Sequence, residues 1–317
     1  MSNIKPIINE TTLPIDDSNG ASLQHKTWHE SHIILRRLNY VLLSKKRGDD
    51  IGLFDNLQDN DMSELDLAIK CEVILHRDFW RSFGYSLLKN AAKAGLSNVV
   101  NVLLKHAKDD VEFADKAFKL LFSACLHGHL EVVRVLLEHG VDMHKFSYYN
   151  GSFITCLNIA SKTGNLALVR LLLDFGADPN LVRLECGYPP LMGAIMYGWV
   201  DVVRLLLDHG ADINWTKTPN GWRSAICCAC AYNHIDIAEL LLLDYGADVN
   251  ARNNVGDTPL MIVLSNRPDS KDLLQLLLEH GADPSIANKG KTALDYVAEG
   301  SEIAHMLINL QLEPVLK

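Results

Sequence analysis

A stretch of about a dozen residues that ends in Gly-Ala-Asp, or once in Gly-Val-Asp, recurs five times along this chain of 317 residues. The copies run from Glu131 to Asp142, Leu166 to Asp178, Val200 to Asp212, Ile235 to Asp248 and Asp272 to Asp283. Their glycines are 34 to 36 residues apart. A period of this length is typical of arrays in which each unit buries its apolar side only against its neighbours. The repeat therefore argues against a fold built around one globular core.

Each copy has the pattern of an amphipathic helix that ends at its glycine. The third copy carries a wide apolar stripe, as expected of a helix packed on two sides: Val202, Val203, Leu205, Leu206 and Leu207. Acidic residues lie in the first turn of some copies and histidines (His139, His209, His280) in the last turn of others, where each suits the helix dipole. The glycine that follows can adopt the left-handed conformation that ends a helix.

A second helix is predicted in each unit, ahead of the copy just described. Thr258-Pro259 shows how it begins, because threonine can cap a helix and proline has no N–H to lose in the first turn. The corresponding pairs elsewhere depart from this form; they are Lys119-Leu120, Thr155-Cys156, Pro189-Pro190, Ser224-Ala225 and Thr292-Ala293. Asn233 replaces the usual glycine between the helices of the fifth unit, and the sixth unit carries Arg267-Pro268-Asp269-Ser270 there.

With this period and this pair of helices, the chain resembles the ankyrin-repeat family over about residues 85 to 310. The resemblance implies an all-α fold, a helical repeat with short hairpin loops that forms an ankyrin-repeat solenoid with an N-terminal helical cap. We count seven units, from a degenerate first unit (Tyr85 to His106) to a C-terminal cap (Lys289 to Leu310). The predicted domains are a disordered segment (1–27), a helical N-terminal cap or small recognition domain (28–84) and the repeat domain (85–317).

Charge and apolar patterning narrow the partners and the compartment. The net charge of -9 argues against nucleic acid, which needs a basic face. No apolar run approaches the ~18 residues of a membrane span, and no secretory signal is recognisable at the N-terminus. We therefore expect a monomeric cytoplasmic protein with reduced cysteines, binding one or more proteins of unknown identity. The nucleus, and delivery as a bacterial effector, stay open as alternatives.

The reactive side chains do not form a recognisable catalytic or metal-binding pattern. Cys227, Cys228 and Cys230 crowd into one predicted helix and are interpreted as small buried residues, with zinc or redox chemistry as the alternative. The family register places Cys228 on the groove side. Cys71 and His76 lie five residues apart, which does not put them on one helical face. We expect no enzyme, no cofactor and no metal; the alternative is an enzyme or effector whose N-terminal segment carries catalysis while the repeats recruit substrate.

The resemblance implies that hairpin tips and first helices form a groove for a partner protein, which makes the chain an adaptor or scaffold. Mapped by register, these parts are rich in aromatic residues and arginine, the types that dominate interface energetics. The alternative is that some rings lie over the solenoid's own backbone. The candidate partner-binding residues are Phe146, Tyr148, Tyr149, Arg183, Tyr188, Tyr197, Trp215, Lys217, Trp222, Arg223 and Tyr232.

Two asparagines form a separate hypothesis. Asn214 and Asn250 each follow an acidic-aliphatic pair and stand eight residues after a leucine, Leu206 or Leu242. This resembles the pattern that asparaginyl hydroxylases use on ankyrin repeats, and the two residues are candidate hydroxylation sites. The competing interpretation is that each asparagine bridges neighbouring hairpins through hydrogen bonds.

Overall fold

The computed structural model describes residues 85–107, 111–183, 187–215, 224–267 and 270–312. The chain divides into two compact units, Met1–Asn90 and Ala91–Lys317. Of the first unit only the beginning of helix α4 (Tyr85–Ala94) is described. The predicted segments 1–27 and 28–84 lie outside the described residues, so their disorder and their role as a cap stay predictions.

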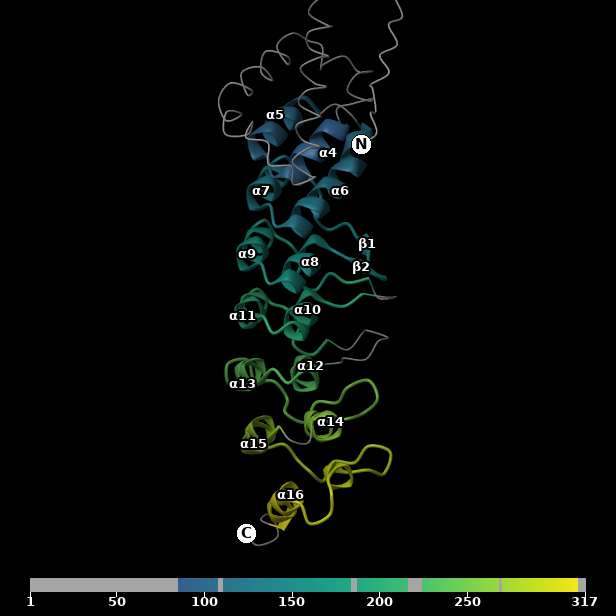
Figure 1. Cartoon of the computed structure of the whole chain (residues 1–317), viewed down its shortest axis with the longest axis vertical. Helices are drawn as coiled ribbons and strands as arrows, with labels where there is room; N and C mark the ends of the chain where they lie inside the picture. Colours follow the sequence, from purple (N-terminus) through teal and green to yellow (C-terminus); the bar gives the residue numbers. More distant parts are fainter. Residues whose placement is uncertain (1–84, 108–110, 184–186, 216–223, 268–269, 313–317) are drawn as a thin grey trace, which may run out of the picture. The chain divides into compact units, whose positions relative to one another are not determined.

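The second unit is a row of antiparallel helix pairs, each stacked on the next (Figure 1). After α5 (Ser97–Ala107), the first helices of successive pairs are α6 (Val111–His127), α8 (Cys156–Thr163), α10 (Pro190–Met196), α12 (Ala225–Tyr232) and α14 (Pro259–Asn266). Their second helices are α7 (Leu130–Glu138), α9 (Leu166–Asp174), α11 (Val200–Asp208), α13 (Ile235–Leu243) and α15 (Lys271–Glu279). The last pair is the 3-10 helix η2 (Ala293–Tyr296) and α16 (Glu302–Leu312).

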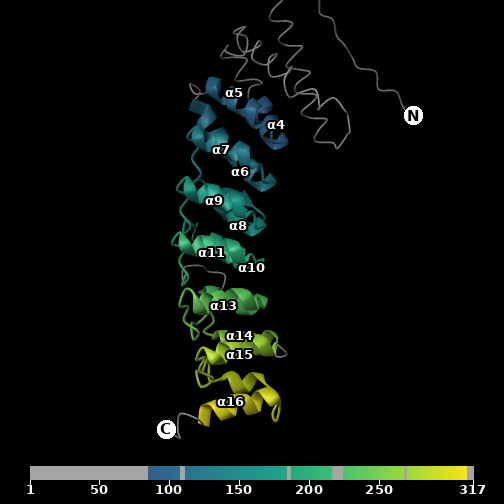
Figure 2. The ribbon, with the colours of Figure 1, turned by 90° about the vertical axis from the view of Figure 1, so that its left-hand side faces the viewer.

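These helices form two layers, which we call the first-helix layer and the second-helix layer. They occupy separate columns in Figure 1, and the pairs follow one another in the turned view of Figure 2. The connections between pairs project from the first-helix layer, and one of them forms a two-stranded antiparallel hairpin of β1 (Ser147–Tyr149) and β2 (Ser152–Ile154). For the described residues, the predicted helical repeat with short hairpin loops is confirmed.

The core lies where the apolar stripes of the second helices meet the first helices. In α11 the predicted stripe is buried at Val202, Val203, Leu205 and Leu206, and only Leu207 is partly exposed. Equivalent leucines are buried in the neighbouring helices α9 and α13. The spacing of apolar residues along the chain therefore identified the packed side of these helices correctly.

The second helices end as their sequence predicts, with an additional hydrogen bond. His139, His209 and His280 each follow the last helical residue, and Nδ1 of each lies 2.8 Å from the carbonyl oxygen four residues earlier. Because a carbonyl oxygen can only accept, Nδ1 carries the proton and satisfies an oxygen that the helix end leaves unpaired. Between the helices of one pair, Asn233 takes over the glycine position with a left-handed φ of 61°.

Two units depart from the regular first helix. Helix α6 begins at Val111, so it already contains the Lys119-Leu120 pair that corresponds to the start of the other first helices. In the last unit the helix after Thr292 is only the short η2. There the Asp295 carboxylate accepts from the backbone N–H and the hydroxyl of Thr292, at 2.6 and 3.1 Å, and Val297 already has extended backbone.

Candidate partner-binding surface

Eight of the eleven predicted binding residues lie in the described part of the chain. Lys217, Trp222 and Arg223 lie outside the described residues. The other eight divide among a hairpin cluster, a row of tyrosines on the first helices, and one buried tryptophan. The three groups differ in what their side chains can offer to a partner.

The hairpin cluster is built on the β1–β2 turn. Asn150 and Gly151 both have positive φ (48° and 83°), the combination that a two-residue turn between twisted strands requires. The turn sets Tyr148 opposite Phe153, with ring centroids 5.2 Å apart at a steep angle. On the next connection, the guanidinium carbon of Arg183 lies 4.0 Å from the centroid of the Phe153 ring. The rings and the arginine thus join two neighbouring connections.

Members of this cluster differ in accessibility. Tyr148 is 67% exposed, whereas Tyr149 is partly buried and meets Phe122 of α6 edge-on, with centroids 6.1 Å apart. Phe146 is also partly buried. The two interpretations drawn from the sequence, contact with a partner and packing on the solenoid itself, therefore each fit a different residue. Tyr149 packs on the helix layer below it, and Tyr148 presents most of its ring to solvent.

The tyrosine row consists of Tyr188, Tyr197 and Tyr232 and crosses the first-helix layer. Asn158 of α8 donates through Nδ2 to the carbonyl oxygen of Tyr188, 2.7 Å away, which holds the start of α10 against α8. Gly193 allows this close packing, because a Cβ there would lie only 3.3 Å from Cε2 of Tyr188. At the ends of α10 and α12, Tyr197 and Tyr232 are 50% and 38% exposed. Packed helices therefore present partly exposed rings.

Lys162 links the tyrosines electrostatically. Its Nζ lies 5.6 Å from the centroid of the Tyr197 ring, within the range of a cation–π contact. Burial raises the pKa of Tyr188; the positive charge of Lys162 offsets part of this, and Tyr197 adds to the increase. Burial likewise raises the pKa of Tyr232, with smaller contributions from Cys228 and Tyr197. At neutral pH the hydroxyls of Tyr188 and Tyr232 stay protonated and can donate hydrogen bonds.

The two helix layers carry different charge. Helices α8, α10, α12 and α14, with α6 from Lys116 onward, contain no Asp or Glu and carry three lysines: Lys116, Lys119 and Lys162. The second helices α7, α9, α11, α13 and α15 carry nine acidic and four basic residues. The negative charge of these pairs is therefore concentrated away from the tyrosine row.

Trp215 is buried, whereas the sequence suggested a residue accessible to a partner. Its side chain is only 8% exposed, and its indole N–H is buried with no hydrogen-bond partner among the described residues. The expectation of an exposed anchor on a connecting segment is corrected here, because the base of the connection is enclosed and not presented to solvent. We leave Trp215 out of the proposed binding surface.

The cysteines are packing residues throughout the described chain. Cys125, Cys156, Cys227, Cys228 and Cys230 are reduced and buried. Burial raises the pKa of the Cys227 thiol to about 12, and the pKa values of Cys228 and Cys230 rise further for the same reason. Cys228 is fully buried, so its expected place on the groove side is wrong. Cys71 and His76, the residues of the catalytic alternative, lie outside the described residues.

One exposed ring escaped the sequence interpretation. Trp199, directly before α11, packs over Gly164 of the preceding pair and donates from Nε1 to the carbonyl oxygen of Lys162, 3.1 Å away. His129 and His234 occupy the same position in other pairs and contact the pair before them in the same way. The signal was present in the sequence, since each of these residues directly follows the left-handed residue between two helices: Gly128, Gly198 or Asn233.

The asparagine positions behave differently from one repeat to the next. Asn250 bridges to the following connection, donating to the carbonyl oxygen of Gly281 (3.2 Å) and accepting from the N–H of Asp283 (2.9 Å). Asn180 makes the same two bonds one repeat earlier. The side chain of Asn214 is exposed and makes no such bond within the described residues. Bridging thus accounts for Asn250 and Asn180 but not for Asn214.

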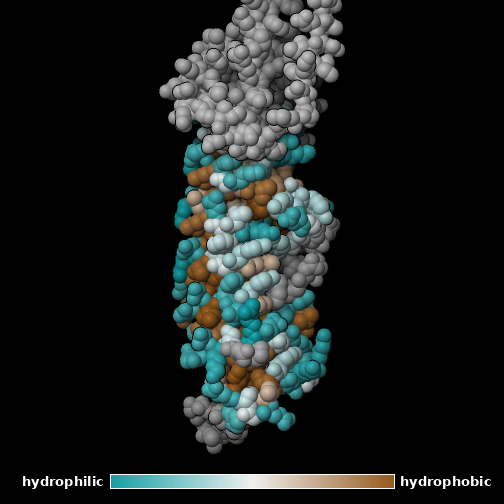
Figure 3. Space-filling view, viewed as in Figure 1, coloured by the Kyte–Doolittle hydropathy of each residue, from teal (hydrophilic) through white to brown (hydrophobic). Residues whose placement is uncertain are grey.

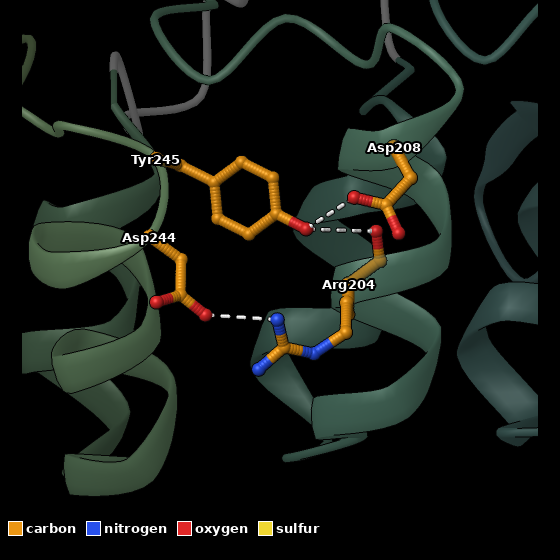
Figure 4. A network of polar contacts seen from close by, with 4 residues as sticks. All are labelled: Arg204, Asp208, Asp244 and Tyr245. Atoms are coloured by element: carbon orange, nitrogen blue, oxygen red, sulfur yellow. Dashed lines mark hydrogen bonds and ion pairs between the residues drawn. The ribbon is translucent and has the colours of Figure 1, made fainter.

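The missing bridge of Asn214 is explained by the turn after α13. Gly246 in this turn is the equivalent of Gly210 and Gly281, which accept the bonds from Asn180 and Asn250. Two residues, Asp244 and Tyr245, separate α13 from Gly246, where one histidine separates α11 from Gly210. Figure 4 shows Tyr245 reaching back to α11, where its hydroxyl donates to Asp208 over 2.6 Å, and Asp244 pairing with Arg204 at 2.8 Å. Burial and the bond to Asp208 raise the pKa of Tyr245 to about 12. These contacts stand in place of the asparagine bridge.

Hydroxylation is therefore predicted to favour Asn214. We expect an asparaginyl hydroxylase to add one oxygen to Asn214 faster than to Asn250, because Asn250 must first give up two hydrogen bonds to enter an active site. Peptide masses after a time course of incubation measure both rates in one sample. Equal rates at the two residues, or no added oxygen, would contradict this prediction.

Within the described residues, no group of three or more His, Cys, Asp or Glu side chains is arranged to hold a metal ion. No described helix combines the length and the apolar composition that crossing a membrane requires.

Comparison with known proteins agrees with the stacked helix pairs described above. A family model described as ankyrin repeats (3 copies) matches residues 157–253 and 242–317, and one described as ankyrin repeats (many copies) matches residues 121–173. The ankyrin repeat protein YahD of Escherichia coli (strain K12) is 34% identical over 160 residues, which cover 49% of this chain and 78% of YahD.

Solved structures show the same fold. The ankyrin repeat domain of human ASB11 aligns with a TM-score of 0.56 at 26% identity, covering 70% of this chain and 96% of that one. The ankyrin repeat domain of Bcl-3, a member of the IkappaB protein family, aligns with a TM-score of 0.58 at 24% identity, covering 71% and 96%.

Proposed function

Because the chain belongs to the ankyrin-repeat family, we propose that it is an adaptor or scaffold that holds a partner protein on its connections and first helices. Ankyrin repeats are protein–protein interaction modules. The observation that carries the proposal is the set of exposed rings on packed elements, Tyr148, Tyr197 and Tyr232. A tyrosine held this way offers a large contact area and a hydroxyl, and it loses little conformational freedom on binding.

The first-helix layer supports this assignment better than the second-helix layer does. Interface cores are depleted in Asp and Glu and enriched in tyrosine and arginine. Helices α8, α10 and α12 contain no Asp or Glu and lie along the tyrosine row, whereas the second helices α11 and α13 carry several carboxylates. We propose no catalytic role for the repeats. The expected monomeric state and cytoplasmic location stay predictions.

Replacing Tyr197 and Tyr232 together by alanine tests the proposal. The partner is first isolated by affinity purification on the full chain, and the purified pair is then measured by calorimetry. We expect the Kd to rise by about 30-fold or more, which corresponds to about 2 kcal/mol, because both rings are truncated at the centre of the surface.

The matched control is Leu243→Ala, which truncates an exposed apolar side chain at the end of α13 in the second-helix layer. Its Kd and the thermal midpoints of both variants should match the original protein. If the control weakens binding and the double tyrosine variant does not, the surface has been placed on the wrong layer.

A further inference from the structure

We infer that the partner presents an extended segment rich in Asp and Glu to the tyrosine row and the hairpin cluster. This inference rests on the proposed function and specifies the chemistry of the partner. It starts from the distribution of charge. In a chain of net charge -9, helices α8, α10, α12 and α14, together with α6 from Lys116 onward, carry lysines and no Asp or Glu, whereas the first turns of α6 contain Glu112 and Asp115. An acidic segment would be attracted to the first-helix layer and repelled by the second helices. Charge therefore favours binding of such a segment on the first-helix layer.

The two cations closest to the exposed tyrosines are held by rings. Lys162 lies over Tyr197, and Arg183 lies 4.0 Å from the centroid of Phe153. Stacking of this kind fixes the position of a long side chain before a ligand arrives, which lowers the entropy that binding costs.

The tyrosine hydroxyls complete a surface that suits carboxylates. Burial raises the pKa of Tyr188, so its hydroxyl stays protonated at neutral pH, and a phenol donates a hydrogen bond well to a carboxylate oxygen. Hydrophobic residues reach the face seen in Figure 3 in separate patches between hydrophilic ones. A wholly apolar helix would therefore find no continuous stripe to cover, whereas an extended polar segment can use rings and charges in turn.

Geometry sets the expected spacing of the acidic residues. Neighbouring packed helices lie about 8 to 10 Å apart, and an extended chain advances about 3.3 Å per residue. A ligand that crosses from α8 to α10 and α12 thus passes one first helix about every three residues. We expect Asp or Glu to recur at about this interval, alternating with residues that contact the rings.

Selection from a library of random 12-residue peptides, displayed on phage and panned against the full chain, tests the inference. We expect the enriched peptides to be acidic, and a synthetic copy to lose affinity as salt is raised, because screening weakens charge attraction. Replacing the Asp and Glu residues of that copy by Asn and Gln should raise its Kd by about tenfold or more, as should Lys162→Glu combined with Arg183→Glu in the chain.

Arg170→Glu is the control, since it reverses a charge at an exposed position of α9 in the second-helix layer and should leave the Kd unchanged. Enrichment of neutral or basic peptides, no enrichment, or stronger competition by single-stranded DNA than by the acidic peptide would overturn the inference. Neutral peptides that are lost on Tyr197→Ala with Tyr232→Ala would overturn only the acidic chemistry and leave the proposed function standing. Enriched peptides that none of these surface variants affects would contradict the proposed function itself.

Discussion

Leu206→Ala is expected to lower the free energy of unfolding by about 2 to 5 kcal/mol, the usual cost of truncating a fully buried leucine. Leu206 lies in the middle of α11, and no part of its side chain is exposed. In a repeat array each unit depends on the interfaces with its neighbours, so the loss affects the pairs on both sides. Against a typical total of about 5 to 15 kcal/mol, such a loss can unfold one end of the array before the other.

Urea denaturation followed by circular dichroism measures this effect. Leu207→Ala is the matched control, because it is the same substitution one residue further along α11 at a position that is partly exposed. Its cost should be clearly smaller. Equal costs for the two variants would mean that the packed side of α11 has been assigned incorrectly.

The burial of Leu206 shows what the sequence predicts well. The apolar stripe, the capping by Thr258, and the turn at each glycine are local features, each determined by residues within one or two helical turns. Repetition then reinforces them, because the same spacing recurs at every period. The all-α repeat follows from these local rules without knowledge of any distant contact.

What the sequence did not predict depends on contacts between repeats. The extra residue before Gly246 was visible as a longer spacing, yet nothing local indicates that Tyr245 would bind Asp208 of the preceding pair. Helix α6 extends to Val111, well before the Lys119-Leu120 pair that corresponds to the start of the other first helices. The β1–β2 hairpin has a recognisable Asn-Gly turn, but the ring contacts between Phe153 and Arg183 join two different connections. Contacts of this kind arise only when the repeats are stacked.

The candidate site shows the same division. Tyr197 and Tyr232 were identified by register, because a residue at the end of a first helix occupies the same place in every unit. Cys228 was misplaced by the same register, since α12 is packed on all sides at that residue. Whether a side chain between two repeats points inward depends on its neighbours across the interface, and the sequence of one repeat does not contain that information.

Trp215→Ala is expected to cost about 3 to 5 kcal/mol of folding stability, because the indole is almost fully buried and its removal leaves a large cavity. This reverses the expectation from sequence, in which Trp215 would anchor a partner and contribute little to folding. The chain should therefore unfold at a markedly lower urea concentration, while the fraction that stays folded binds the partner with an unchanged Kd.

Trp215→Phe separates the two roles. Phenylalanine keeps most of the apolar volume and removes a buried N–H that has no partner among the described residues, so its cost should be well below that of alanine. A binding anchor would respond differently, since hot-spot tryptophans contribute through contact with the partner. If Trp215→Ala raises the Kd by about 30-fold while the unfolding midpoint stays in place, the ring belongs to the interface and the enclosed base of this connection opens when the partner binds.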